Sequence, residues 1–163
     1  MKEFEIDVSG EDILSKNYSV CVADKDSIIK GFKFSEEIVN NLCSRYGQGL
    51  YRYKKSKKRK ADLKIRVYCV AIYYIFKSIN MQGSISLKLC RDFDGREDDI
   101  RKELKLFLEK KLNLDLDDRI YFLRLNPESN AHKYAYLMRV DNKNRMSTYI
   151  EISLDDFEKW LKK

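Results

Sequence analysis

The chain has 163 residues, of which 44% are hydrophobic and 36% are charged, so it can form one soluble domain with a sizeable core. One proline and six glycines exclude a collagen-like or low-complexity chain. The 33 lysines and arginines outnumber the 26 aspartates and glutamates, and the net charge of +7 excludes an acidic solvating chain and favours anionic partners.

The N-terminal part of the chain predicts three strands joined by short turns. Phe4, Ile6 and Val8 alternate with polar residues, which is the period-two pattern of a strand with one buried face. Short apolar runs over 18–23 and 28–34, with a polar turn between them, predict two further strands. We expect these three strands to form an antiparallel meander.

The rest of the chain predicts alternating helices and strands. In chain order these are a helix over 35–46, the longest helix over 61–81, a strand over 85–92, a helix over 98–112, a strand over 120–125 and a helix over 127–140. A short strand and helix follow as an appendix over 147–163. This order predicts an α/β fold in which a mixed five-stranded sheet, three antiparallel strands and then alternating helix and strand, has helices on both faces. We expect a single domain, with its core over about 3–140.

The cysteines indicate neither a metal finger nor a redox pair. Cys21, Cys43, Cys69 and Cys90 are far apart in the sequence and lie among apolar residues, as small buried side chains do. The charged N-terminus does not resemble a signal peptide, and the longest apolar run, 67–76, is too short to span a bilayer. We therefore expect reduced thiols, a cytoplasmic protein and no membrane partner.

Residues 51–60, which we call the basic segment, concentrate the positive charge of the chain. They contain seven lysines and arginines and no acid, and like-charge repulsion predicts a loop until about Ala61. Aromatic faces at Tyr51 and Tyr53 suit stacking on unpaired bases, while the cations suit phosphates. A solvated mobile loop is the alternative. The residues expected to contact nucleic acid are Tyr51, Arg52, Tyr53, Lys54, Lys55, Lys57, Lys58, Arg59 and Lys60.

Three aspartates on different elements are candidates for a shared site. Asp7 lies within the first strand and Asp92 at the end of the strand after the longest helix, and we expect these two strands to be parallel neighbours. Asp62 lies in the first turn of the longest helix, where the helix dipole favours an acid. A helix-terminal role for Asp62 and a turn role for Asp92 are alternatives. Asp7 is harder to explain in this way, because burial of a carboxylate costs energy unless it has a partner.

Short sequences around these acids are similar to those of a known superfamily. Asp7-Val8-Ser9-Gly10 ends the first strand, Ala61-Asp62-Leu63 begins the longest helix, and Leu89-Cys90-Arg91-Asp92 ends the next strand. The strand over 120–125 is followed by Ser129-Asn130-Ala131-His132. In these features and in element order, the chain resembles the ribonuclease H-like superfamily over residues 3–140.

The resemblance implies a ribonuclease H-like fold with one or two Mg²⁺ or Mn²⁺ ions. The implied metal ligands and catalytic residues are Asp7, Asp62, Asp92 and His132. His132 departs from the family, because ribonuclease H itself has an aspartate there, and a histidine shifts the preference toward Mn²⁺. Reserve ligands, if the assumed register is wrong, are Asp141, Glu11 and Glu128.

The expected function is that of a divalent-metal-dependent nuclease, which hydrolyses phosphodiester bonds of DNA, RNA or a hybrid. A catalytically inactive nucleic-acid-binding module of the same fold is one alternative. A protein-interaction domain, with Trp160 as an aromatic anchor, is the other. A homodimer stays open, since a resolvase-type nuclease would require one.

Overall fold

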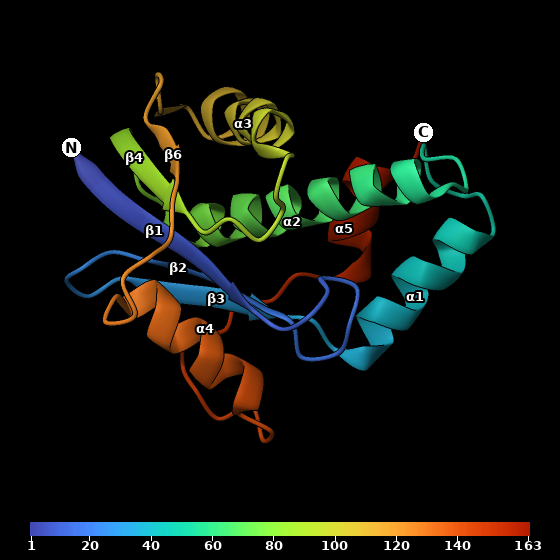
Figure 1. Ribbon diagram of the computed structural model, residues 1–163, viewed down its shortest axis with the longest axis horizontal. Helices are drawn as coiled ribbons and strands as arrows, with labels where there is room; N and C mark the ends of the chain where they lie inside the picture. Colours follow the sequence, from blue (N-terminus) through green and yellow to red (C-terminus); the bar gives the residue numbers. More distant parts are fainter.

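A mixed β-sheet organises the protein, and the computed structural model describes all residues, 1–163 (Figure 1). Five strands follow one another across the sheet in the order β3-β2-β1-β4-β6, and the two-residue β5 also pairs with β4. The strands are β1 (Lys2–Ser9), β2 (Ser19–Ala23), β3 (Ile29–Lys33), β4 (Gly83–Leu89), β5 (Leu114–Asp115) and β6 (Ile120–Phe122).

The direction of each strand agrees with the order of elements predicted from the sequence. β2 pairs antiparallel with both β1 and β3, which confirms the predicted meander. β4 runs parallel to β1, and β6 runs parallel to β4. The predicted α/β fold with a mixed sheet is therefore confirmed.

Helices cover both faces of this sheet (Figure 1). The helices are α1 (Glu36–Gly47), α2 (Lys57–Ile79), α3 (Glu97–Leu104), the π-helix η1 (Lys105–Lys111), α4 (Asn130–Val140) and α5 (Leu154–Leu161). Alternate residues of β2 show the division: Val20 and Val22 belong to the main core around α2, whereas Cys21 and Ala23 pack with Ala135 of α4. Asp7, opposite Cys21 in the strand register, therefore lies on the α4 face.

α2 begins at Lys57, so the prediction that the basic segment stays irregular until Ala61 is wrong. Ser56 caps the helix, because its hydroxyl accepts a hydrogen bond from the backbone N–H of Arg59. The helix ends at Asn80, which adopts the left-handed conformation that favours asparagine or glycine. The cap offsets the repulsion among the exposed lysines of the first turn.

Three other predicted elements differ in their form or length. The helix predicted over 98–112 becomes α3 followed by the π-helix η1, which a side-chain pattern does not distinguish from an α-helix. The helix predicted from Pro127 begins instead at Asn130, because Ser129 provides the N-cap. The strand predicted over 120–125 is shorter than expected, because β6 ends at Phe122.

The predicted strand over 149–152 is also wrong, because this segment forms only an isolated bridge between Tyr149 and Gly31 of β3. Gly31 donates its N–H to the Thr148 carbonyl at 2.9 Å and accepts from the Ile150 N–H at 2.8 Å. These bonds cover the outer edge of β3. A side chain at Gly31 would collide with Met138 of α4 and with the Val20 carbonyl, so glycine allows this close packing.

None of the helices is long and apolar enough to cross a bilayer. All four cysteines are free.

Candidate functional site

Asp7 and His132 are in contact at the carboxyl end of β1. The Asp7 side chain is 10% exposed, and its Oδ2 lies 2.9 Å from Nδ1 of His132 in the first turn of α4. Its other oxygen, Oδ1, accepts the backbone N–H of Val8 at 2.8 Å. The His132 side chain is half exposed. The structure thus brings together Asp7 and His132, two of the predicted site residues.

Asp92 follows β4 and lies near Asp7. The Tyr18 hydroxyl donates to Asp92 Oδ2 at 2.6 Å, which fixes the orientation of this carboxylate. The residue is exposed at the surface, yet desolvation of its carboxyl by the surrounding protein raises the pKa of Asp92, and the charges of Asp7 and Asp12 raise it further. In the strand register Cys90 lies beside Asp7, and Asp92 follows two residues later. We call Asp7 and Asp92 the acidic pair.

Two side chains beside this acidic pair have polar groups that sequence reasoning missed. Cys90 continues the register of β4 beside Asp7, and burial and the Asp7 charge raise the pKa of its thiol, which excludes a reactive thiolate. Tyr68 of α2 is buried, and its hydroxyl has no hydrogen-bond partner. Burial, followed by the nearby Cys90 and Tyr18, raises the pKa of Tyr68. In the sequence, the only sign of this buried hydroxyl is that the apolar face of the helix contains a tyrosine rather than a phenylalanine.

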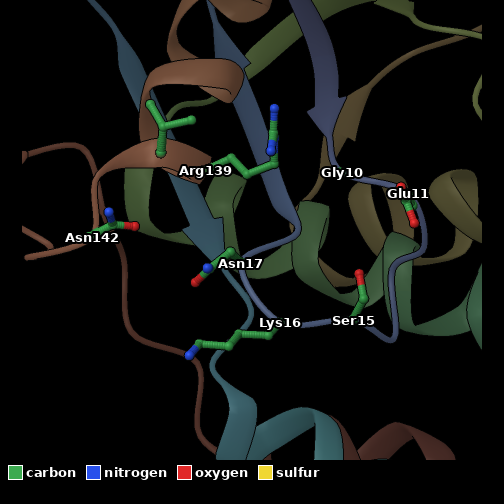
Figure 2. Close-up of a pocket in the computed structure, with 8 residues that line it drawn as sticks. Gly10, Glu11, Ser15, Lys16, Asn17, Arg139 and Asn142 are labelled. Atoms are coloured by element: carbon green, nitrogen blue, oxygen red, sulfur yellow. The ribbon is translucent and has the colours of Figure 1, made fainter.

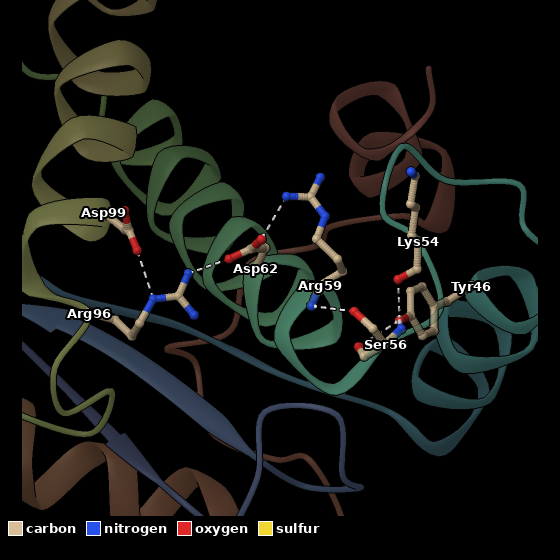
Figure 3. A network of polar contacts seen from close by, with 7 residues as sticks. All are labelled: Tyr46, Lys54, Ser56, Arg59, Asp62, Arg96 and Asp99. Carbon is tan, nitrogen blue, oxygen red and sulfur yellow. Dashed lines mark hydrogen bonds and ion pairs between the residues drawn. The ribbon is translucent and has the colours of Figure 1, made fainter.

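Asp62 belongs to a different group of side chains (Figure 3). One of its carboxylate oxygens accepts from Arg59 at 2.9 Å, and the other accepts from Arg96, which also pairs with Asp99 at 2.7 Å. Both oxygens of Asp62 are therefore occupied by guanidinium groups. The structure does not bring Asp62 to Asp7, and its arginine partners give it a structural role between α2 and the start of α3.

The acidic pair has different partners from several other carboxylates, because its only basic partner is His132, which contacts Asp7. Neither Asp7 nor Asp92 contacts a lysine or arginine. Five other carboxylates that are at least partly buried each form an ion pair: Asp12 with Lys64, Asp24 with Lys2, Asp62 with Arg59, Glu103 with Arg66 and Glu158 with Arg45. Asp7 and Asp92 thus differ from these five carboxylates in having no lysine or arginine partner.

A complete protein-made metal cage is not present at this place. No three side chains among the histidines, cysteines, aspartates and glutamates are grouped closely enough to hold an ion by themselves. The reserve ligand Asp141 is engaged elsewhere, because its carboxylate accepts from the Tyr149 hydroxyl at 2.7 Å. An ion bound here would take only part of its coordination from the protein.

The aromatic residues of the basic segment are buried, so the prediction that they stack on bases is wrong. Tyr51 is 2% exposed and Tyr53 is 9% exposed, and both belong to the main core. The Tyr51 hydroxyl donates to the carboxylate of Glu158 in α5 at 2.8 Å. The segment is further anchored through Tyr46, whose hydroxyl donates to the Lys54 carbonyl at 2.8 Å (Figure 3).

The cations of the basic segment, in contrast, face solvent. Its exposed basic residues are Arg52, Lys54, Lys55, Lys57, Lys58 and Lys60. Lys57, Lys60, Lys64 and Tyr68 recur at intervals of three and four residues and so lie along one side of α2. This side leads from the basic segment to the buried Tyr68 beside the acidic pair. Two exposed cations, Lys57 and Lys60, thus share this side of α2 with Tyr68, whereas Lys64 between them is paired with Asp12.

Comparisons with protein-family models, with curated proteins and with solved structures found no match to this chain. Its function must therefore be argued from its own residues.

Proposed function

We propose that the protein is a divalent-metal-dependent nuclease that hydrolyses phosphodiester bonds, with Asp7 and Asp92 as its metal-binding carboxylates. The observation that carries this proposal is a pair of carboxylates without lysine or arginine partners at the carboxyl ends of the adjacent parallel strands β1 and β4. The Asp7 charge contributes to the raised pKa of Asp92, and no lysine or arginine neutralises either carboxylate. A cation between two such groups relieves their repulsion, as basic side chains do for the other enclosed acids.

The donor set fits Mg²⁺ or Mn²⁺ when substrate completes the coordination. Magnesium is commonly held by one or two carboxylates together with water and phosphate oxygens, so a three-residue cage is not required. When bound, such an ion activates water and stabilises charge on the phosphate that is being cleaved. Oxygen ligands from Asp7 and Asp92 suit both ions.

The neighbouring side chains support this assignment by orienting the two carboxylates. His132 lies against Asp7 Oδ2 and the Val8 N–H donates to Asp7 Oδ1, whereas Tyr18 donates to Asp92 Oδ2. Groups that orient metal ligands in this way strengthen binding and fix its geometry. In this proposal His132 positions Asp7, and Asp62 takes no part.

The basic segment and the lysine side of α2 supply phosphate contacts for the substrate. Exposed lysines bind nucleic acid through backbone charge, without reading sequence. A catalytically inactive binding module is the second candidate function, because the same lysines would serve it and the metal cage is incomplete. The presence or absence of metal-dependent cleavage separates the two.

The direct test combines metal binding with cleavage. Calorimetric titration with Mn²⁺ and with Mg²⁺, in the absence and in the presence of a phosphorothioate oligonucleotide that resists hydrolysis, is expected to show binding that the oligonucleotide strengthens. Cleavage of labelled single-stranded, duplex and hybrid substrates is expected with either ion and is expected to stop with EDTA. Metal binding that is absent in both titrations would refute the proposal. Nucleic-acid binding without cleavage would favour the inactive module.

Replacing Lys54, Lys55, Lys57 and Lys58 by glutamine is expected to weaken nucleic-acid binding and its dependence on salt. Each lysine–phosphate interaction that is removed lowers the slope of log affinity against log salt by about 0.7 to 0.9, so the combined change is about 3. The slope of log affinity against log salt is measured by fluorescence anisotropy at about 50 to 200 mM salt, because affinity changes strongly with salt over that range. The matched control replaces four exposed lysines outside the segment, namely Lys25, Lys77, Lys102 and Lys110. An equal change in the control would show that only net charge matters.

A further inference from the structure

A polar hollow lies beside the loop that follows β1 (Figure 2). Its volume is about 730 Å³, and it lies between the loop after β1 and the C-terminal end of α4. The residues that line it are Gly10, Glu11, Ser15, Lys16, Asn17, Arg139, Val140 and Asn142, of which only Val140 is hydrophobic. Its walls therefore suit a polar ligand.

The hollow is built from the same loop as the acidic pair. Arg139 donates from Nε to the hydroxyl of Ser9, two residues after Asp7, at 2.7 Å. Gly10 is in a left-handed conformation, and a Cβ there would meet the ring of Tyr18 at 2.9 Å. Tyr18 is the residue that orients Asp92. The loop that lines the hollow thus contacts residues adjoining both carboxylates.

Amide side chains face one another across the hollow. Figure 2 shows Asn17 and Asn142 on opposite walls, with their amide groups directed toward the space between them. The backbone N–H of Asn17 is already used, because it donates to the Phe34 carbonyl at 2.8 Å. Side-chain amides offer both a donor and an acceptor, which is how proteins contact the edges of nucleobases.

A second hollow of about 350 Å³ continues from the first. The two share Lys16, Asn17 and Asn142, and the second adds Lys33 and Tyr149. The Lys33 amine lies 5.3 Å from the centre of the Tyr149 ring, so a cation and an aromatic side chain occur together there. Two acids, Glu11 and Glu36, also line these walls, against the three cations Lys16, Lys33 and Arg139.

We propose that these two hollows form one groove that binds a single-stranded segment of the substrate beside the bond to be cleaved. Arg139 and Lys16 contact a backbone phosphate, and the amides of Asn17 and Asn142 contact a base. Bases are accessible to such contacts only when they are unpaired, which selects single strands or strand ends. The claim that the cleaved bond lies beside the groove depends on the proposed nuclease function. The claim that the groove binds a single strand does not depend on it.

The test is nuclear magnetic resonance titration of the full chain, ¹⁵N-labelled and kept in EDTA, with adenosine 5′-monophosphate and with a four-nucleotide single strand. We expect shifts of the Gly10, Lys16, Asn17 and Asn142 amides. Lys16→Ala and Asn142→Ala are each expected to weaken binding of the four-nucleotide strand about tenfold. Lys143→Ala is the matched control, because Lys143 is exposed next to Asn142 but does not line the groove.

Shifts confined to the basic segment and α2 would overturn the groove, as would an equal loss of affinity in the Lys143→Ala control. Because EDTA removes divalent metal, binding is measured independently of cleavage. A chain that binds the strand in the groove but never cleaves it would support the groove and refute the nuclease. Metal-dependent cleavage that is unaffected by Lys16→Ala and Asn142→Ala would refute the groove alone.

Discussion

Asp7→Asn is expected to lower kcat/KM for nucleic-acid cleavage by about a thousandfold while leaving nucleic-acid affinity within about twofold. The asparagine keeps the size of the side chain but removes the negative charge that binds the metal. Metal ions stabilise the charge of the transition state by several kcal/mol, and about 1.4 kcal/mol corresponds to a tenfold change in rate. Affinity, measured in EDTA so that bound metal does not contribute, is conserved because the phosphate contacts lie in the basic segment, along α2 and in the groove.

The measurement is single-turnover cleavage with saturating Mn²⁺, together with calorimetric Mn²⁺ titration of the same variant. Asp94→Asn is the matched control, since Asp94 is an exposed aspartate close to Asp92 in the chain. Asp62→Asn adds a second comparison: it is expected to reduce stability through Arg59 and Arg96 but to keep cleavage. Full activity in Asp7→Asn, or its loss in Asp62→Asn at unchanged stability, would contradict the assignment of the metal ligands.

Glu158→Ala is expected to destabilise the fold by about 1 to 3 kcal/mol, the cost of leaving a buried polar group unpaired. Glu158 is 2% exposed, and its carboxylate accepts from Arg45 and from the Tyr51 hydroxyl, each at 2.8 Å. Removing the carboxylate leaves the Tyr51 hydroxyl buried and unpaired and removes the counter-charge of Arg45. The loss of stability is therefore larger than that from an ordinary surface ion pair.

Urea unfolding, followed by circular dichroism, gives the free energy of unfolding for this variant. Glu151→Ala serves as the control, because Glu151 is exposed and precedes the same helix, α5. Glu158→Gln is expected to lose less stability than Glu158→Ala, since an amide oxygen still accepts from Tyr51. A Glu158→Ala variant as stable as the Glu151→Ala control would show that the buried pair contributes nothing.

Much of the fold could be predicted because its strands and helices have clear periodicities. Alternation at Phe4, Ile6 and Val8 predicted β1, and the helical spacing within 61–81 predicted α2. Short connections then left few ways to order the strands. The parallel pairing of β1 with β4, and with it the approach of Asp7 to Asp92, followed from this order.

The errors concern contacts between residues that are far apart in the sequence. Tyr51 was expected at the surface because its neighbours are charged, but its hydroxyl is held by Glu158, 107 residues later. Asp62 was expected to face Asp7, but its carboxylate instead forms an ion pair with Arg96, which lies 34 residues later in the chain. Neither local charge nor helix position contains this information. Tyr18 and Cys90 were missed because their polar atoms lie within apolar patterns.

The bonds of Thr148 and Ile150 to Gly31 bear on how the chain folds while it is being made. An uncovered strand edge can pair with strands of other molecules. Because synthesis proceeds from the N-terminus, β3 emerges long before the segment that covers its edge. The nascent chain therefore carries an open edge until nearly all of its strands and helices exist, and the risk of aggregation is concentrated in that interval.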